Sequence, residues 1–288
     1  MRTLAADIVS VFKLRIGVAI TLTALVGLVV TPGPAVPAWK ALLLALCVLA
    51  SSGSAGAFNQ IIERGLDARM ARTRDRPFVR GAFRAGPAWY IGILLLLVFP
   101  VGASAVCLGG FAALYIFLGA FVYGVVYTVW LKPRSTLNIV VGGLAGSFAV
   151  LAGSAVIDPS PSALPLLFAL ALFLWTPPHF WSLAMAARAD YARAGVPMLP
   201  VVLGDRTTAR VILAHAVALV AVSLLPAMHG MGPVYLTFAV SGGLYFLWKS
   251  VLLVRAPTRA TAMANFHGSL VQLGLMLAGG LLGHAFAL

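Results

Sequence analysis

Three oxygen-bearing side chains recur at every fourth position where an apolar stretch of the chain ends. Asn59, Glu63 and Asp67 stand at positions i, i+4 and i+8. At about 3.6 residues per turn, this spacing predicts one slowly drifting face of a helix. Two carboxylates and an amide oxygen form an oxygen ligand set that suits Mg²⁺, which binds one or two carboxylates together with substrate phosphates. The spacing therefore suggests a metal site at the end of this helix.

Arginines crowd the same stretch. The segment from Phe58 to Gly81 carries three of the seven acidic residues and six of the twenty Lys and Arg. Guanidinium groups bind phosphate oxygens in bidentate fashion, so a metal with arginines beside it fits a diphosphate. The alternative is that the arginines orient the chain in a membrane and that the acids only pair with them. Acids near membrane depth are costly and tend to be functional, which favours the diphosphate site.

The rest of the chain indicates helices that cross a membrane. Its 288 residues are 61% apolar and only 9% charged, and the mean hydropathy is +1.02. We expect an all-α membrane protein, a single domain over residues 1–288, with nine transmembrane helices in one bundle around a central cavity. The apolar runs that predict these helices lie approximately at 16–34, 39–58, 88–106, 109–130, 138–157, 164–184, 208–227, 232–251 and 262–284.

Charge sets the expected orientation of this bundle. With the N-terminus in the cytoplasm, nineteen of the twenty Lys and Arg fall on the cytoplasmic side, and only Lys40 falls outside. Both long acid-bearing loops, 59–87 and 185–207, then face the cytoplasm, so we expect an active site near that face of the cell (inner) membrane. The same loops account for the net charge of +13, which argues against a nucleic-acid partner.

Longer motifs resemble one enzyme family. The run from Asn59 to Asp67, followed by RMARTRDRP, resembles the first motif of the UbiA superfamily of intramembrane prenyltransferases. WTPPHFWSLAMAARADYARAGVPMLPVVLG, from Trp175 to Gly204, closely resembles the signature of the protohaem IX farnesyltransferase (haem O synthase) branch. FKLRIG and YTVWLKPRSTLNIVVGGLAG also match that branch, so the resemblance covers essentially the whole chain.

The sequence departs from the family pattern at three places. Glu63 stands where the family often has Asp, and Leu14 replaces a common Pro. The second motif carries Asp190 alone, where the quinone-type branch has several acids. The lone acid leaves open whether one or two Mg²⁺ ions bind, and it disfavours a quinone precursor as the acceptor.

The resemblance implies a reaction and the residues that carry it. A farnesyl group would pass from farnesyl diphosphate to a vinyl group of haem B, and water would supply the hydroxyl of the hydroxyethylfarnesyl side chain of haem O. The implied Mg²⁺ ligands and catalytic residues are Asn59, Glu63, Asp67 and Asp190. The implied diphosphate-binding residues are Lys13, Arg15, Arg72, Arg76 and Lys132.

The haem itself also needs partners. Its propionates could be received by basic residues such as Lys13, Arg15, Arg188 and Arg193. A later haem-modifying enzyme or a terminal oxidase assembly would take the product.

His179 follows two prolines, Pro177 and Pro178, inside a predicted span. Such prolines free backbone carbonyls, so a neutral imidazole here could bond a freed carbonyl or ligate haem iron. The residues alone favour the carbonyl, and the resemblance adds haem contact as an equal alternative. The candidates for haem contact are His179, Trp175, Tyr191 and His267. Aromatic rings at Tyr127, Trp175, Phe180 and Trp181 could face a developing carbocation or simply pack.

Two other functions fit the sequence less well. A UbiA-type transferase with a hydroxybenzoate or chlorin acceptor is disfavoured by WTPPHFW and by the lone Asp190. A transporter is expected to show broken helices at the membrane midplane and repeated halves. Here Pro177–Pro178 is the only clear break, and the acids gather at one mouth of the bundle.

Overall fold

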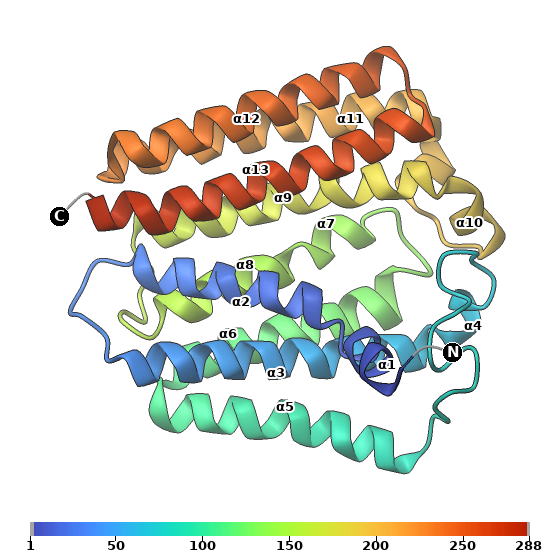
Figure 1. Ribbon diagram of the computed structural model, residues 1–288, viewed down its shortest axis with the longest axis horizontal. Helices are drawn as coiled ribbons and strands as arrows, with labels where there is room; N and C mark the ends of the chain where they lie inside the picture. The colour runs from blue at the N-terminus through green and yellow to red at the C-terminus, as the bar shows by residue number, and fades with distance from the viewer. Residues whose placement is uncertain (1–2, 287–288) are drawn as a thin grey trace.

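Helices account for all the regular secondary structure of the described chain. The structure is a computed structural model that describes residues 3–286, and the surroundings of side chains up to residue 283. Figure 1 shows long helices running side by side in one bundle. Helices of this length suit a chain rich in apolar residues, because lipid offers no hydrogen bonds and a helix satisfies its own backbone groups.

The helices fall into a long and a short group. The long ones are α2 (Leu14–Val29), α3 (Ala38–Ile62), α5 (Pro87–Cys107), α6 (Gly110–Phe121), the π-helix η1 (Val122–Leu131) that continues it, α8 (Leu144–Ser154), α9 (Ala163–Ala186), α11 (Leu199–Leu224), α12 (Gly232–Arg255) and α13 (Arg259–Phe286). The short ones are α1 (Leu4–Val11), α4 (Arg64–Asp67), α7 (Asn138–Gly142), α10 (Arg188–Arg193) and the 3₁₀ turn η2 (Leu225–His229).

The protein is a multi-pass membrane protein, but the predicted number of nine spans is not confirmed. Seven helices in the described part are long and apolar enough to cross a membrane, and there are eight if the bent pair of α1 and α2 forms one span. Residues 138–154 form a shorter apolar segment that is divided into α7 and α8. Gly142 and Gly143 lie at the division, and consecutive glycines weaken a helix there.

One predicted loop is partly helical. Residues 185–207 were expected to connect two spans, yet α10 forms within them and α11 begins at Leu199. Gly204 has φ 75° and ψ 169°, a conformation outside the helical range that kinks α11. The expected span from residue 208 is therefore the part of α11 that follows this kink.

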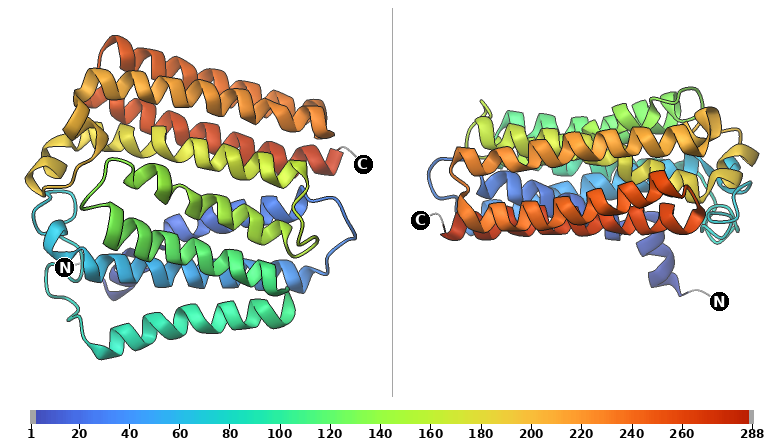
Figure 2. Two further views of the ribbon diagram at one scale, coloured as in Figure 1. Left: turned by 180° about the vertical axis from the view of Figure 1, so that it is seen from behind. Right: turned by 90° about the horizontal axis from the view of Figure 1, so that it is seen from above.

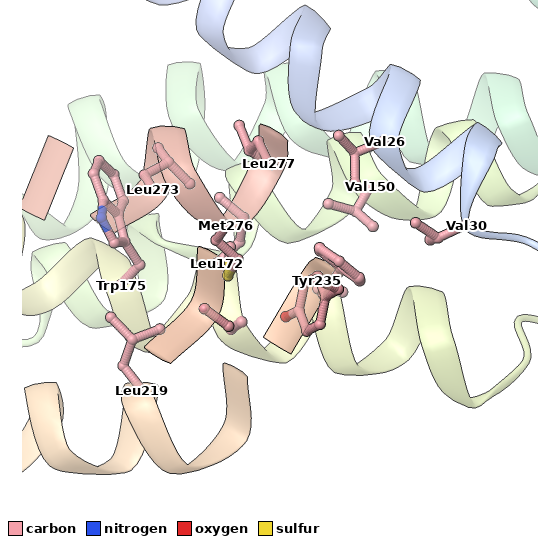
Figure 3. Close-up of a cluster of buried hydrophobic side chains, with 14 of the residues drawn as sticks. Val26, Val30, Val150, Leu172, Trp175, Leu219, Tyr235, Leu273, Met276 and Leu277 are labelled. Carbon is pink, nitrogen blue, oxygen red and sulfur yellow. The ribbon is translucent and has the colours of Figure 1, made fainter. Parts of the chain in front are cut away.

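The largest apolar core joins the last four long helices to α2 and α8. Phe168 on α9, Leu219 on α11, Tyr235 on α12 and Met276 on α13 have no accessible surface. Figure 3 shows one continuous cluster, with Trp175 and Leu219 at one side, the valines of α2 and α8 at the other, and Met276 and Tyr235 between them. This packing fixes α9 and α13 against the first half of the chain.

Two glycines let α2 and α8 touch backbone to backbone. A Cβ atom on Gly153 would lie 1.9 Å from the carbonyl oxygen of Ala24, and one on Gly27 would lie 2.1 Å from that of Val150. No larger residue fits at either position without moving a helix. Small residues of this kind are what close packing of membrane helices requires.

The short helices α1, α4 and α10 gather at one end of the bundle, together with the loop that follows α4 (Figure 1). We call this end the loop end. In the second view of Figure 2, α1 projects from one face of the bundle. Asp7 on α1 is buried and forms an ion pair with Arg80 of the loop, so α1 is tied to the same end.

Candidate active site

The predicted stripe of Asn59, Glu63 and Asp67 continues through the end of α3. The amide of Glu63 donates to the carbonyl of Asn59 at 2.9 Å, and the amide of Asp67 donates to that of Glu63 at 2.8 Å. These bonds keep the helical spacing across the junction with α4. The three residues are only 1–2% exposed, so the stripe faces the protein interior.

Each member of the stripe meets one cationic side chain. Lys13 Nζ donates to Asn59 Oδ1 at 2.5 Å. Lys132 Nζ lies 2.6 Å from Glu63 Oε2, and Arg76 NH1 lies 2.6 Å from Asp67 Oδ2. The acids therefore do pair with cations, but only Asp67 pairs with an arginine of its own loop. Three of the five predicted diphosphate-binding residues meet at this stripe.

The π-helix η1 brings the last turn of its span to the stripe. Its backbone bonds join residues five apart, as in the bond from the Lys132 amide to the Tyr127 carbonyl at 2.9 Å. This wider turn places Tyr123, Thr128 and Lys132 toward α3. Asn59 Nδ2 donates to Thr128 Oγ1 at 2.8 Å, and Lys13 Nζ donates to the Tyr123 hydroxyl at 2.6 Å. Tyr123 and Thr128 were not predicted as site residues, because the apolar run at 109–130 indicates an ordinary α-helix.

Lys13 reaches the stripe because the chain turns sharply between α1 and α2. It is the one non-glycine residue with positive φ, 49°, in the described chain. The turn rests on α3 at Gly56, where a Cβ atom would lie 3.2 Å from the carbonyl oxygen of Phe12. This close contact aims the Lys13 ammonium at Asn59.

The side chain of Asp190 accepts a hydrogen bond from the backbone of the first acid-bearing loop. The Arg72 amide donates to Asp190 Oδ2 at 3.4 Å, and Arg193 forms an ion pair with Asp190 Oδ1. The Arg72 guanidinium donates to the Tyr191 hydroxyl at 3.2 Å and lies 6.0 Å from the centre of that ring. The two acid-bearing loops are thus in contact, as the predicted site requires.

The oxygens of the stripe suit a metal, though the full predicted ligand set is not assembled. Glu63 Oε1 is buried without a hydrogen-bond partner, so this carboxylate has an oxygen to spare. Asn59 and Asp67 lie one helical turn away on either side. Within the described residues, no three His, Cys, Asp or Glu side chains lie together as a metal site. The participation of Asp190 stays a prediction.

Two further predicted site residues are not part of this hydrogen-bond network. Arg15 and His267 are both exposed. Among the described residues, neither side chain makes a hydrogen bond or an ion pair. Diphosphate binding by Arg15 and haem contact by His267 therefore stay predictions.

His179 is buried inside α9 among aromatic rings. Its ring is stacked on Trp175 at 4.2 Å and on Phe266 at 4.4 Å between ring centres. α9 continues through Pro177 and Pro178, and His179 Nδ1 lies 2.7 Å from the hydroxyl of Ser269 rather than from a freed carbonyl. A haem contact by His179 or Trp175 stays a prediction.

A pocket of about 510 Å³ adjoins the loops at the loop end. Residues from three segments line it: the loop after α4, the junction of α9 with α10, and the start of α13. They include Arg72, Leu183, Asp190, Arg259 and Met263. The central cavity that we expected inside the helical bundle is not this pocket and stays a prediction.

Comparison with known proteins gives the family. The profile of the UbiA prenyltransferase family matches residues 20–278, most of the chain. The chain belongs to the UbiA prenyltransferase family. Membership of that family makes the protein a prenyltransferase.

Among similar proteins of this family are two from Paramagnetospirillum magneticum. Protoheme IX farnesyltransferase 2 is 58% identical, over 93% of this chain and 93% of that protein. Protoheme IX farnesyltransferase 1 is 44% identical, over 93% of this chain and 94% of that protein.

Solved structures share the UbiA fold at lower identity. A digeranylgeranylglyceryl phosphate synthase aligns over 97% of this chain and 98% of its own, with a TM-score of 0.80 and 16% identity. A UbiA homolog from Archaeoglobus fulgidus bound to GPP and Mg²⁺ aligns over 97% and 99%, with a TM-score of 0.73 and 14% identity. These likenesses confirm the all-helical UbiA fold.

Proposed function

We propose that this protein transfers a farnesyl group from farnesyl diphosphate to a vinyl group of haem B, giving haem O. The observation that carries the proposal is the 58% identity, over 93% of both chains, with a protein named protoheme IX farnesyltransferase. The buried stripe with its three cations supports a diphosphate as the leaving group.

The cations act where negative charge grows. As the bond between the farnesyl carbon and the diphosphate oxygen breaks, the leaving group gathers charge that preorganised cations stabilise most strongly. Lys13, Arg76 and Lys132 converge on the stripe and are the groups we assign to that diphosphate. We also assign Arg72, whose guanidinium donates to the Tyr191 hydroxyl of the second loop. The diphosphate leaves with the electron pair of the broken bond, and the terminal vinyl carbon bonds to the allylic carbon. Water adds to the cation that this leaves on the porphyrin side chain and releases one proton, which gives the hydroxyl.

Asn59, Glu63 and Asp67 would hold Mg²⁺, with Asp190 from the second loop. The spare oxygen of Glu63 supports this assignment. When bound, Mg²⁺ supplies a Lewis acid that neutralises the diphosphate oxygens. The apolar walls of the bundle keep water from the farnesyl chain until the vinyl group has reacted. The aromatic rings near the stripe, Tyr123 and Tyr127, stack on each other at 5.6 Å and offer π faces to positive charge.

The placement of the enzyme is part of the proposal. We infer one domain over residues 1–288 in the cell inner membrane, with the N-terminus and the loop end in the cytoplasm. The excess of Lys and Arg in the loops supports this orientation. A haem-modifying enzyme or a terminal oxidase assembly is the expected recipient of the product.

The test is a reconstituted reaction. The purified protein in lipid nanodiscs is given haem B, farnesyl diphosphate and Mg²⁺, and the tetrapyrroles are analysed by mass. We expect haem O, and we expect its formation to stop when a chelator removes Mg²⁺. Hydroxybenzoate and a chlorin are offered in parallel. If either is prenylated and haem B is not, the proposed acceptor is wrong while the prenyltransferase assignment stands.

A further inference from the structure

The pocket at the loop end combines an apolar wall with two guanidinium groups. Leu183 and Met263 form part of the wall, together with four alanines. Arg72, from the loop after α4, and Arg259, at the first turn of α13, both line it. A volume of about 510 Å³ lies in the range of small-molecule sites, which are typically about 300–1,000 Å³.

The ion pairs of the loop end leave Arg259 without an anionic partner. Arg193 pairs with Asp190 and Arg188 pairs with Asp205, so these two earlier candidates for the haem propionates are engaged. Arg259 makes no side-chain hydrogen bond or ion pair with any residue between 3 and 283. Its position at the start of a 28-residue helix adds the favourable field of a helix N-terminus for an anion.

We propose that this pocket receives the propionates of the tetrapyrrole acceptor and that Arg259 is their principal anchor. The apolar wall would hold the adjoining ring edge. The inference rests on the proposed function, because it assigns the binding site of that same acceptor. Asp190 also lines the pocket, but its charge is offset by Arg193, so it does not cancel the attraction of Arg259.

The pocket also adjoins both acid-bearing loops, which carry the residues that we assign to the reaction. It shares Arg72 with the loop that carries the oxygen stripe, and it shares Asp190 with the second loop. An acceptor anchored by carboxylates at Arg259 would therefore have its ring close to both acid-bearing loops. The proposal places Arg259 at the carboxylates and not at the reacting vinyl group, so its loss should affect binding of the acceptor and not the chemistry.

The experiment compares Arg259→Gln with Arg255→Gln. Arg255 is exposed at the end of α12 and does not line the pocket, so it controls for the loss of one positive charge. We expect Arg259→Gln to raise the KM for haem B, and its Kd by absorbance titration, about tenfold, the cost of one charge-assisted hydrogen bond. We expect the kcat, and the KM for farnesyl diphosphate, to stay at the wild-type values.

Protohaem dimethyl ester provides a second measurement, because its propionates carry no charge. The ester should bind the wild type about as weakly as haem B binds Arg259→Gln, and the substitution should not weaken ester binding further. Equal KM and Kd for haem B in the two Arg variants, or tight binding of the ester by the wild type, would overturn the inference and leave haem O synthesis intact. If the wild type makes no haem O, the inference falls together with the proposed function.

Discussion

Glu63 is a buried carboxylate whose partner, Lys132, comes from a span that is distant in the sequence. Both side chains are almost fully buried, and their charged atoms are 2.6 Å apart. Removal of one partner leaves an uncompensated buried charge, which costs about 3–5 kcal/mol. The pair therefore has a structural role as well as the catalytic role that we assign to it.

Glu63→Ala should lower the melting temperature and abolish turnover. The physical reason for the lower stability is the unpaired Lys132 ammonium, so the double variant Glu63→Gln, Lys132→Met should recover most of the stability. It should still make no haem O, because the metal ligand and the diphosphate partner are both gone. Thermal melts by circular dichroism and product mass separate the two effects. Activity in the double variant would contradict the catalytic assignment.

Asp67→Ala tests the stripe with a smaller structural cost. Asp67 is buried, but the side chain of its partner Arg76 is 20% exposed and can turn to water. We expect turnover to be lost while the melting temperature changes little. Asp75→Ala, an exposed acid of the same loop, is the control and should behave as the wild type. Retained turnover in Asp67→Ala would remove Asp67 from the metal site.

Residue types and spacing were enough to predict the stripe, since a helix fixes which positions share a face. Lys13, Arg76 and Lys132 were expected as cations of the site only because the family resemblance implies them. The pairing of each cation with its acid depends on how distant spans pack, and no local pattern carries that information. Thr128 shows this limit, because it reaches Asn59 through a π-helix that hydrophobic periodicity does not reveal.

At the level of elements, the contact between α2 and α8 depends on two glycines. Gly153→Ala would place a methyl group 1.9 Å from the Ala24 carbonyl oxygen, so the helices must separate. We expect a loss of at least about 1–3 kcal/mol in stability, seen as a lower melting temperature and yield. Gly102→Ala on the exposed face of α5 meets no atom within 4 Å and should be neutral or slightly stabilising. Equal melting temperatures would show that the contact is dispensable.

Hydrophobic runs located most of the spans but not their divisions. The run at 138–157 was long enough to predict one helix, and the structure breaks it into α7 and α8 at consecutive glycines. The start of α11 was missed because Asp205, Arg206 and Arg210 make residues 199–210 resemble a loop in composition. Charge at a helix end lowers hydropathy without preventing the helix.

For the whole molecule, the distribution of charge predicts the orientation in the membrane. In a background without Cys47 and Cys107, Ser160→Cys lies in the exposed link before α9, and Arg74→Cys lies in the loop after α4. An impermeant maleimide added to intact cells should label Ser160→Cys, while Arg74→Cys should react only after the membrane is disrupted. The reverse pattern would place the loop end outside the cytoplasm. Equal labelling in disrupted membranes is the control for access to each thiol.

The turn at Lys13 affects how a mutational survey of this protein should be interpreted. A methyl group at position 56 would lie 3.2 Å from the Phe12 carbonyl oxygen, so the turn must shift by a few tenths of an ångström. We expect this shift to loosen the hydrogen bond from the Lys13 ammonium to Asn59. Such a variant keeps every charged residue and inserts into the membrane normally, yet it would ionise its substrate slowly. A survey that measures only the amount of folded protein would therefore not distinguish Gly56→Ala from the wild type. The effect of this substitution must be measured in the rate of the reaction.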